Sequence, residues 1–299
     1  MAKVFKLNAH GYAAEVVPEY GMNCIKILHV KSGADILRTP ENIDVLQDNV
    51  LYGMPILFFP NRISNGKFEF EGREYVFPIN EPKLNNFCHG DLHKLPFEVR
   101  ECDDEHILGV FTATDEHPYM TFPHSFEFCV EYKIDKNGVC QTVSVKNTSD
   151  KNMPFALAFH TTFKLQNGDK IKLPVCAKVE RNMATYLPTG EISKEFDLKN
   201  SFLEGEYQPY GQPISTLCEL DGRELLICKK EKNEKISYTI DEKYKYCMVY
   251  SGDGKEYICL EPQTWLTNCP NLNLDRNLCG FDFIPPQTVK KYKSVIKIV

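Results

Sequence analysis

The feature that most constrains the fold is a strict alternation of apolar and polar residues in short segments. In the clearest one, every second residue from Phe126 to Ile134 is apolar or aromatic. A period of two places these side chains on one face of a β-strand. The pair Asn137-Gly138 tolerates positive φ and predicts a type I′ turn, after which residues 139–147 return as the partner strand. We therefore expect an antiparallel hairpin with one buried face.

Similar segments recur along the chain, with turn residues between them. Residues 67–70 and 73–77 alternate around Glu71-Gly72 and predict a second hairpin. Most of the 18 prolines fall between such segments, as β-ladders require. Further expected strands cover residues 94–102, 107–114, 155–165, 237–240, 247–251, 257–260 and 292–299. No helix-length amphipathic segment, linker or long repeat interrupts them, so we expect a single all-β, antiparallel domain over residues 1–299.

Composition argues against several classes of function. The formal net charge of −6 and the isoelectric point near 5.8 are opposite to the clustered positive charge of a nucleic-acid-binding protein. The 12 cysteines are scattered without a CxxC pair, so we expect reduced thiols rather than disulfides or a zinc site. There is neither a signal peptide nor an apolar run of the ~20 residues that a membrane helix needs. We expect a soluble, cytoplasmic protein.

His160 is the histidine with the most informative setting. It ends the segment 155–160, in which Phe155, Leu157 and Phe159 form one face of the expected strand. The other face carries Ala156 and Ala158 before the imidazole, and such small residues leave space above a sheet for a ligand. The alternative is a core histidine that is bonded to a carbonyl group.

Glu261 follows the expected strand 257–260 and precedes Pro262, which confines it to extended geometry and is expected to end the ladder. Its side chain would then project from a strand end, as a carboxylate base at the rim of a pocket. The alternative is an exposed glutamate without a role.

Three further polar residues stand beside turns. Asn61 and Arg62 directly follow the apolar run 56–59, and the rigid donor fork of arginine either fixes ligand hydroxyl groups or pairs with a carboxylate. His89 precedes Gly90, which permits close approach of the backbone to a ligand. The remaining histidines are interpreted as surface or turn residues: His10, His29, His93, His106, His117 and His124.

In order and context, these segments resemble the aldose 1-epimerases of the galactose mutarotase superfamily. The resemblance covers nearly the whole chain. It is carried by Gly53-Met54-Pro55-Ile56-Leu57-Phe58-Phe59-Pro60-Asn61-Arg62-Ile63, by His89-Gly90, by residues 147–163 and by Cys259-Leu260-Glu261-Pro262-Gln263-Thr264.

The resemblance implies an antiparallel β-supersandwich fold and a mechanism without metal or nucleotide. Glu261 would take the proton of the anomeric hydroxyl of a hexose, while protonated His160 gives one to the ring oxygen. The ring then opens, rotates about the C1–C2 bond and closes as the other anomer. His89, Asn61 and Arg62 would hold the sugar. A carboxylate near His160 is expected to keep the imidazole protonated near neutral pH.

The chain departs from the family pattern at two points. The sequence His160-Thr161-Thr162-Phe163 lacks the aromatic residue that often follows the catalytic histidine. The nearest candidate for the family's sugar-binding aspartate is Asp221, but Asp221-Gly222 is also an ordinary turn. Two other functions stay open: a hexose-phosphate epimerase, which needs further cations in the pocket, and a sugar-binding protein without catalysis.

Overall fold

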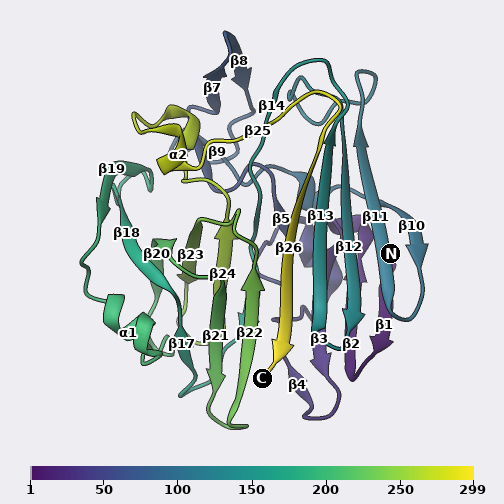
Figure 1. The fold of residues 1–299 in the computed structure, drawn as a ribbon, viewed down its shortest axis with the longest axis vertical. Helices are drawn as coiled ribbons and strands as arrows, with labels where there is room; N and C mark the ends of the chain where they lie inside the picture. The colour runs from purple at the N-terminus through teal and green to yellow at the C-terminus, as the bar shows by residue number, and fades with distance from the viewer. Residues whose placement is uncertain (1) are drawn as a thin grey trace.

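The alternating segments form the strands of two large antiparallel sheets in the computed structural model, which describes residues 2–299. The C-terminal strand lies in the middle of the first of them, between strands from the two halves of the chain (Figure 1). Sheet 1 consists, in spatial order, of β10 (Glu98–Cys102), β11 (His106–Ala113), β12 (Phe126–Asp135), β13 (Gly138–Asn147), β26 (Val289–Ile298), β22 (Glu234–Ile240), β21 (Glu224–Lys229) and β17 (Lys170–Lys172).

Most strands of sheet 2 come from the middle and the last third of the chain, and β5 comes from the first third. Its spatial order is β19 (Pro188–Ser193), β18 (Val175–Arg181), β20 (Ile214–Leu220), β23 (Tyr246–Ser251), β24 (Tyr257–Gln263), β15 (Ala158–Phe159) and β5 (Ile56–Leu57), and β16 (Thr162–Lys164) also pairs with β24. The single expected strand over residues 155–165 is thus two short strands with a break at His160 and Thr161.

Smaller sheets complete the β structure. Sheet 3 contains four strands: β1 (Phe5–Ala9), β2 (Tyr12–Val17), β3 (Asn23–His29) and β4 (Ala34–Asp35). The pairs are β6 (Arg62–Ser64) with β9 (Asn86–Cys88), β7 (Lys67–Phe70) with β8 (Arg73–Val76), and β14 (Met153–Pro154) with β25 (Phe283–Ile284). The predicted all-β, antiparallel fold is confirmed.

Helices are short and lie outside the sheets. They are α1 (Lys199–Glu204), α2 (Arg276–Cys279) and the 3-10 turns η1 (Pro18–Tyr20), η2 (Ile43–Gln47), η3 (Leu92–Lys94) and η4 (Cys269–Asn271). Within residues 2–299, no helix has the length and apolar character that crossing a membrane requires.

Both predicted hairpins form, but one of the two turns differs from the prediction. Glu71 and Gly72 both take positive φ, 51° and 75°, which matches a type I′ turn. At the turn from β12 to β13, Gly138 has a positive φ of 117° but Asn137 does not, so the predicted type I′ turn at Asn137-Gly138 is wrong. The Asp135 carboxylate accepts the N–H of Asn137 at 2.6 Å, and this local bond holds the turn in ordinary backbone geometry.

Aromatic side chains join the two large sheets. Phe58, next to β5, is fully buried, and its ring centroid lies 5.6 Å from that of Phe126 and 6.2 Å from that of Phe128 in sheet 1. Phe155 lies 5.3 Å from Phe58 and 5.5 Å from Tyr292 of β26. Tight packing of these rings fixes the segment that leads to Asn61 and Arg62.

We predict that Phe58→Ala lowers the free energy of unfolding by about 3–5 kcal/mol, because it removes buried surface and leaves a cavity. Val76→Ala is the control, since Val76 is 49% exposed and its truncation is expected to cost less than about 0.5 kcal/mol. Urea denaturation measures both. Equal midpoints for the two variants would show that Phe58 does not join the sheets.

Candidate active site

A cleft of about 560 Å³ lies over one face of sheet 2. Five of the six residues selected from the sequence line it; Asp221 does not. The lining comprises Asp48, Asn49, Val50, Leu51, Asn61, Arg62, His89, His160, Arg181, Met183, Tyr186, Ser215, Met248, Tyr250 and Glu261.

His160 and Glu261 face each other at the floor of the cleft, where the imidazole Nε2 lies 3.2 Å from the carboxyl Oε1. Their side chains are only 6% and 3% exposed. Ala158 pairs with Gln263 and Thr162 with Cys259, so the same register sets His160 directly opposite Glu261. The two residues are therefore cross-strand neighbours on one face of the sheet.

Pro262 does not end β24, contrary to the sequence-based expectation. The strand continues to Gln263, and Pro262 pairs with Cys247 of β23. On the other edge of β24, the N–H groups of Leu260 and Thr264 donate to the carbonyl groups of Thr161 and Leu157, each at 3.0 Å. Pro262 stands between these donors and has no N–H, so the ladder loses one bond and the strand persists.

This pattern also explains why the acid and the base meet. Residues 260 and 264 occupy the hydrogen-bonded positions of the ladder, so Glu261 and His160 form a non-hydrogen-bonded pair, the kind in which side chains come closest. The His160 N–H donates to the carbonyl of Pro55 at 3.0 Å on the opposite side. The imidazole is thus fixed through its backbone from both neighbouring segments.

Burial controls the protonation of the pair. Removal from water raises the pKa of Glu261 to about 8, against smaller lowering effects of the charges on Arg181 and Arg62. Removal from water lowers the pKa of His160 to about 3. At neutral pH the pair therefore holds one proton, on Glu261. The expectation that the carboxylate keeps His160 protonated is wrong for the free cleft, because desolvation opposes both charged forms.

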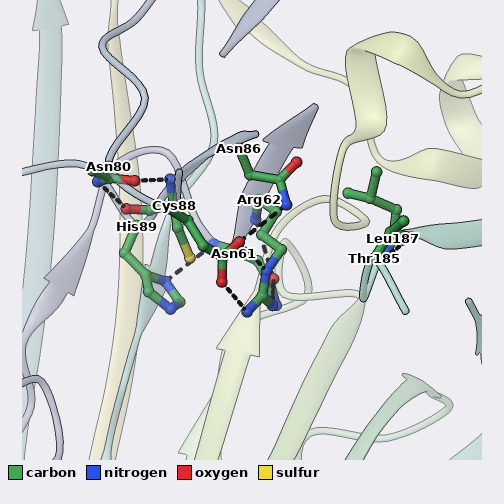
Figure 2. Close-up of polar contacts among 9 residues, drawn as sticks. Asn61, Arg62, Asn80, Asn86, Cys88, His89, Thr185 and Leu187 are labelled. Carbon is green, nitrogen blue, oxygen red and sulfur yellow. Dashed lines mark hydrogen bonds and ion pairs between the residues drawn. The ribbon is translucent and has the colours of Figure 1, made fainter. Parts of the chain in front are cut away.

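His89 and Asn61 are joined by two hydrogen bonds (Figure 2). The N–H of Asn61 donates to His89 Nδ1 at 3.3 Å, and the N–H of His89 donates to the Asn61 carbonyl at 2.9 Å. Since Nδ1 accepts this bond, the neutral ring carries its proton on Nε2, which is the donor left for a ligand. Desolvation, with the charge of Arg62, lowers the pKa of His89 well below its ordinary value, so the ring stays neutral.

Arg62 is paired with a carboxylate, which is one of the two interpretations that its sequence setting left open. Its Nε and Nη2 donate to the two carboxylate oxygens of Glu81 at 2.8 and 2.7 Å. The Asn86 side chain donates to the same carboxylate at 3.0 Å. Arg62 Nη1 points to the Asn61 side-chain oxygen, 3.4 Å away (Figure 2). The guanidinium therefore enters the cleft as half of an ion pair, with Nη1 as its remaining donor group.

Asp221 lies in the turn that follows β20, outside the cleft and exposed to solvent. Its N–H donates to the carbonyl of Pro174 at 2.7 Å. The structure thus gives Asp221-Gly222 the ordinary turn that the sequence also allowed. Asp221 cannot contact a ligand held between His160 and Glu261, and we remove it from the candidate site.

Two of the histidines that were interpreted as surface or turn residues are buried, although they do lie in a turn and a loop. His93 is 5% exposed and His124 is 4% exposed. The two ring nitrogens of His124 lie 2.9 Å from the hydroxyl oxygens of Tyr75 and Ser149, which accounts for its burial. Both histidines occupy polar loop segments whose packing against the sheets was not visible in the sequence.

Sequence reasoning missed four residues that line the cleft from neighbouring strands of sheet 2. Met248 pairs with Glu261, and Tyr250 lies two residues further along β23 on the same face. Ser215 of β20 pairs with Tyr250, and Arg181 of β18 donates to the Ser215 hydroxyl at 3.1 Å. Alternation alone indicates which of these residues share a face. It does not indicate that their strands are neighbours.

One group of side chains in the cleft floor has the composition of a metal site. Ligand atoms of His160, Cys259 and Glu261 all lie within 4.8 Å of one another. Burial raises the pKa of the Cys259 thiol well above its ordinary value. The thiol is therefore protonated in the free cleft, and a metal ion that bound here would have to displace its proton.

The fold and the cleft define a β-sandwich protein with a buried acid–base pair. The sequence model of the aldose 1-epimerase family matches residues 3–295. The chain belongs to this family.

Solved structures agree with this assignment. A galactose mutarotase-like protein from Clostridium acetobutylicum superposes with a TM-score of 0.93 at 29% identity, over 100% of this chain and 95% of that one. An aldose epimerase homologue from C. elegans superposes with a TM-score of 0.78 at 18% identity, over 100% of this chain and 99% of that one. The latter likeness concerns the fold.

A curated relative is the bifunctional protein gal10 of Schizosaccharomyces pombe. It is 28% identical over 166 residues, which cover 49% of this chain and 22% of the yeast protein. The matched segment thus spans less than a quarter of that relative.

We predict that the stability difference between the parent protein and Glu261→Gln depends on pH. The raised pKa of Glu261 means that the unfolded chain releases a proton near pH 4.5 and the folded one only near pH 8. The parent should therefore lose stability relative to the variant by up to about 1.4 kcal/mol per pH unit between these values, and no further above them. Urea denaturation from pH 4 to 9 measures this. A constant difference would show that Glu261 ionises normally.

Proposed function

We propose that the protein is an aldose 1-epimerase that interconverts the α and β anomers of a hexose. The observation that carries this proposal is the buried pair of His160 and Glu261, 3.2 Å apart at the floor of a cleft. Anomer exchange requires one group that removes a proton and one that supplies a proton at the two oxygens of the hemiacetal. A pair that shares one proton meets this requirement in either direction.

The first step is a transfer of the shared proton within the pair. In the free cleft the proton is on Glu261, because desolvation disfavours charge. Hydroxyl groups of a bound sugar solvate the charged forms, and the positive charge of Arg181 favours the carboxylate. The proton then moves to His160, which leaves Glu261 as the base and imidazolium as the acid.

The second step opens the ring. Glu261 takes the proton of the anomeric hydroxyl, the C1–O5 bond breaks, and His160 protonates the ring oxygen to give the open aldehyde. Rotation about the C1–C2 bond presents the other face of the carbonyl group, and closure with reversed proton transfers gives the other anomer. Each such transfer typically contributes about 10²–10⁴ in rate.

The walls of the cleft would orient the sugar. The Nε2–H of His89 lies beside the acid–base pair, since its ring centroid is 5.7 Å from that of His160, and it suits the ring oxygen or an adjacent hydroxyl. Asn61 and the Nη1 group of Arg62 are fixed by bonds on their other sides and suit hydroxyls remote from C1. Neutral and charge-paired donors of this kind bind hydroxyl groups without a large desolvation cost.

We also propose that the chain works as a single domain in the cytoplasm. One hydrophobic cluster includes Phe128 of sheet 1, Leu260 of sheet 2 and Ile27 of sheet 3. All 12 cysteines are free, as a reducing compartment requires.

We predict that Glu261→Gln and His160→Gln each reduce kcat for anomer exchange by at least about 10²-fold. The double variant should be little worse than the poorer single one, because the two residues act as a unit. Both residues are buried, so glutamine is used to keep the volume, and circular dichroism confirms the fold. Exchange is followed by NMR on galactose and glucose in the presence of EDTA. Near-parental turnover of either folded single variant would remove that residue from the mechanism.

A further inference from the structure

Arg181 is a cation that lines the cleft. A neutral sugar offers it no group of opposite charge to bind. Arg181 ends β18, and its Nη2 donates to both the carbonyl and the hydroxyl of Ser215 on the neighbouring strand. These bonds hold one edge of the guanidinium and leave Nε and Nη1 for a ligand. Both acceptors are neutral, so they orient the charge without compensating it.

The surroundings of Arg181 differ in charge from those of Arg62. Arg62 is neutralised by the two oxygens of Glu81. Over residues 2–299, no carboxylate oxygen lies within 4.0 Å of the Arg181 guanidinium. The acidic residues of the cleft lining are Glu261, which holds the shared proton, and Asp48, which is exposed at the rim. The cleft thus contains one half-buried positive charge without a partner.

The position of Arg181 indicates which part of a sugar it would contact. The residues Arg181, Ser215 and Tyr250 belong to three successive strands, and β24, which carries Glu261, comes next. Three inter-strand steps separate the backbones of Arg181 and Glu261 by roughly 14 Å. A sugar whose C1 faces Glu261 therefore presents a remote group to Arg181. In hexoses the exocyclic C6 is the common site of a carboxylate or a phosphate.

We propose that the cleft is built for an aldose with an anionic exocyclic group, and that Arg181 binds this group while His160 and Glu261 act on C1. This inference rests on the proposed epimerase function and extends it to the substrate class. Carboxylate and phosphate share the chemistry that an arginine fork recognises, and they make bonds to it about twice as strong as those between neutral groups.

The test compares anionic with neutral sugars in the intact protein. Anomer exchange is measured by NMR for galacturonate, glucose 6-phosphate, galactose and glucose, each corrected for the rate without protein. Parental protein should show a kcat/KM at least about tenfold higher for one of the anionic sugars than for its neutral counterpart. The two anionic sugars separate a carboxylate site from a phosphate site.

Arg181→Met should raise KM for the preferred anionic sugar at least about tenfold more than KM for its neutral counterpart, because a remote group is bound equally in ground and transition states. Any change that it causes in the Glu261 carboxylate affects both sugars alike and cancels in this ratio. Arg181→Lys should restore part of the loss. Lys178→Met is the matched control: it removes one charge from the same strand, but Lys178 does not line the cleft and pairs with Glu180 at 2.9 Å. Thermal midpoints confirm folding.

Three outcomes can be told apart. Two of them contradict the inference about Arg181, and the third contradicts the epimerase function on which it rests. Equal exchange of neutral and anionic sugars by the parental protein contradicts the anionic substrate and leaves the epimerase function intact. An equal fall of kcat for all sugars in Arg181→Met and Arg181→Lys shows that Arg181 acts only through the Glu261 carboxylate. No acceleration of any of the four sugars contradicts the proposed function itself.

Discussion

The structure of the site depends on one cross-strand pair. β24 runs through Pro262 at the cost of a single ladder bond, and this register places Glu261 opposite His160 at a position where side chains come closest. The packed sheets exclude water from both groups, so each charged form is disfavoured and one proton serves the two. The remaining polar groups of the cleft are arranged around this desolvated pair.

The polar groups around this pair are held in place by hydrogen bonds to the backbone or to a carboxylate. The N–H of Asn61 donates to the His89 ring, the N–H of His89 donates to the Asn61 carbonyl, and Arg62 is held by Glu81 in a bidentate ion pair. An unpaired buried charge costs several kcal/mol, whereas a paired one with satisfied hydrogen bonds is tolerated. The half-buried Arg181 departs from this rule. A cation without a carboxylate partner, in a cleft that otherwise pairs its charges, is consistent with a ligand that carries the missing negative charge.

Alternation and turn residues were sufficient to predict the all-β fold, because a period of two has one structural meaning wherever one face is buried. They left each candidate site residue with a non-functional alternative, and the resemblance to the aldose 1-epimerases selected Asn61, Arg62, His89, His160 and Glu261, all of which line the cleft. Alternation and turn residues failed where the answer depends on which strands become neighbours. Pro262 was expected to end a strand because its partner on β23 was unknown. Asp221 and Arg181 look equally plausible as ligand-binding residues until the order of β18, β20, β23 and β24 is known.

The central claim is that His160 and Glu261 share one proton and use it to open a sugar ring. Its most direct test is the pH dependence of anomer exchange by the parental protein, followed by NMR at equilibrium. The account predicts acceleration at neutral pH that falls as the pH rises through about 8, where the pair loses its only proton and no acid remains. Acceleration that continues to rise above this pH would contradict the shared proton, and no acceleration at any pH would contradict the mechanism.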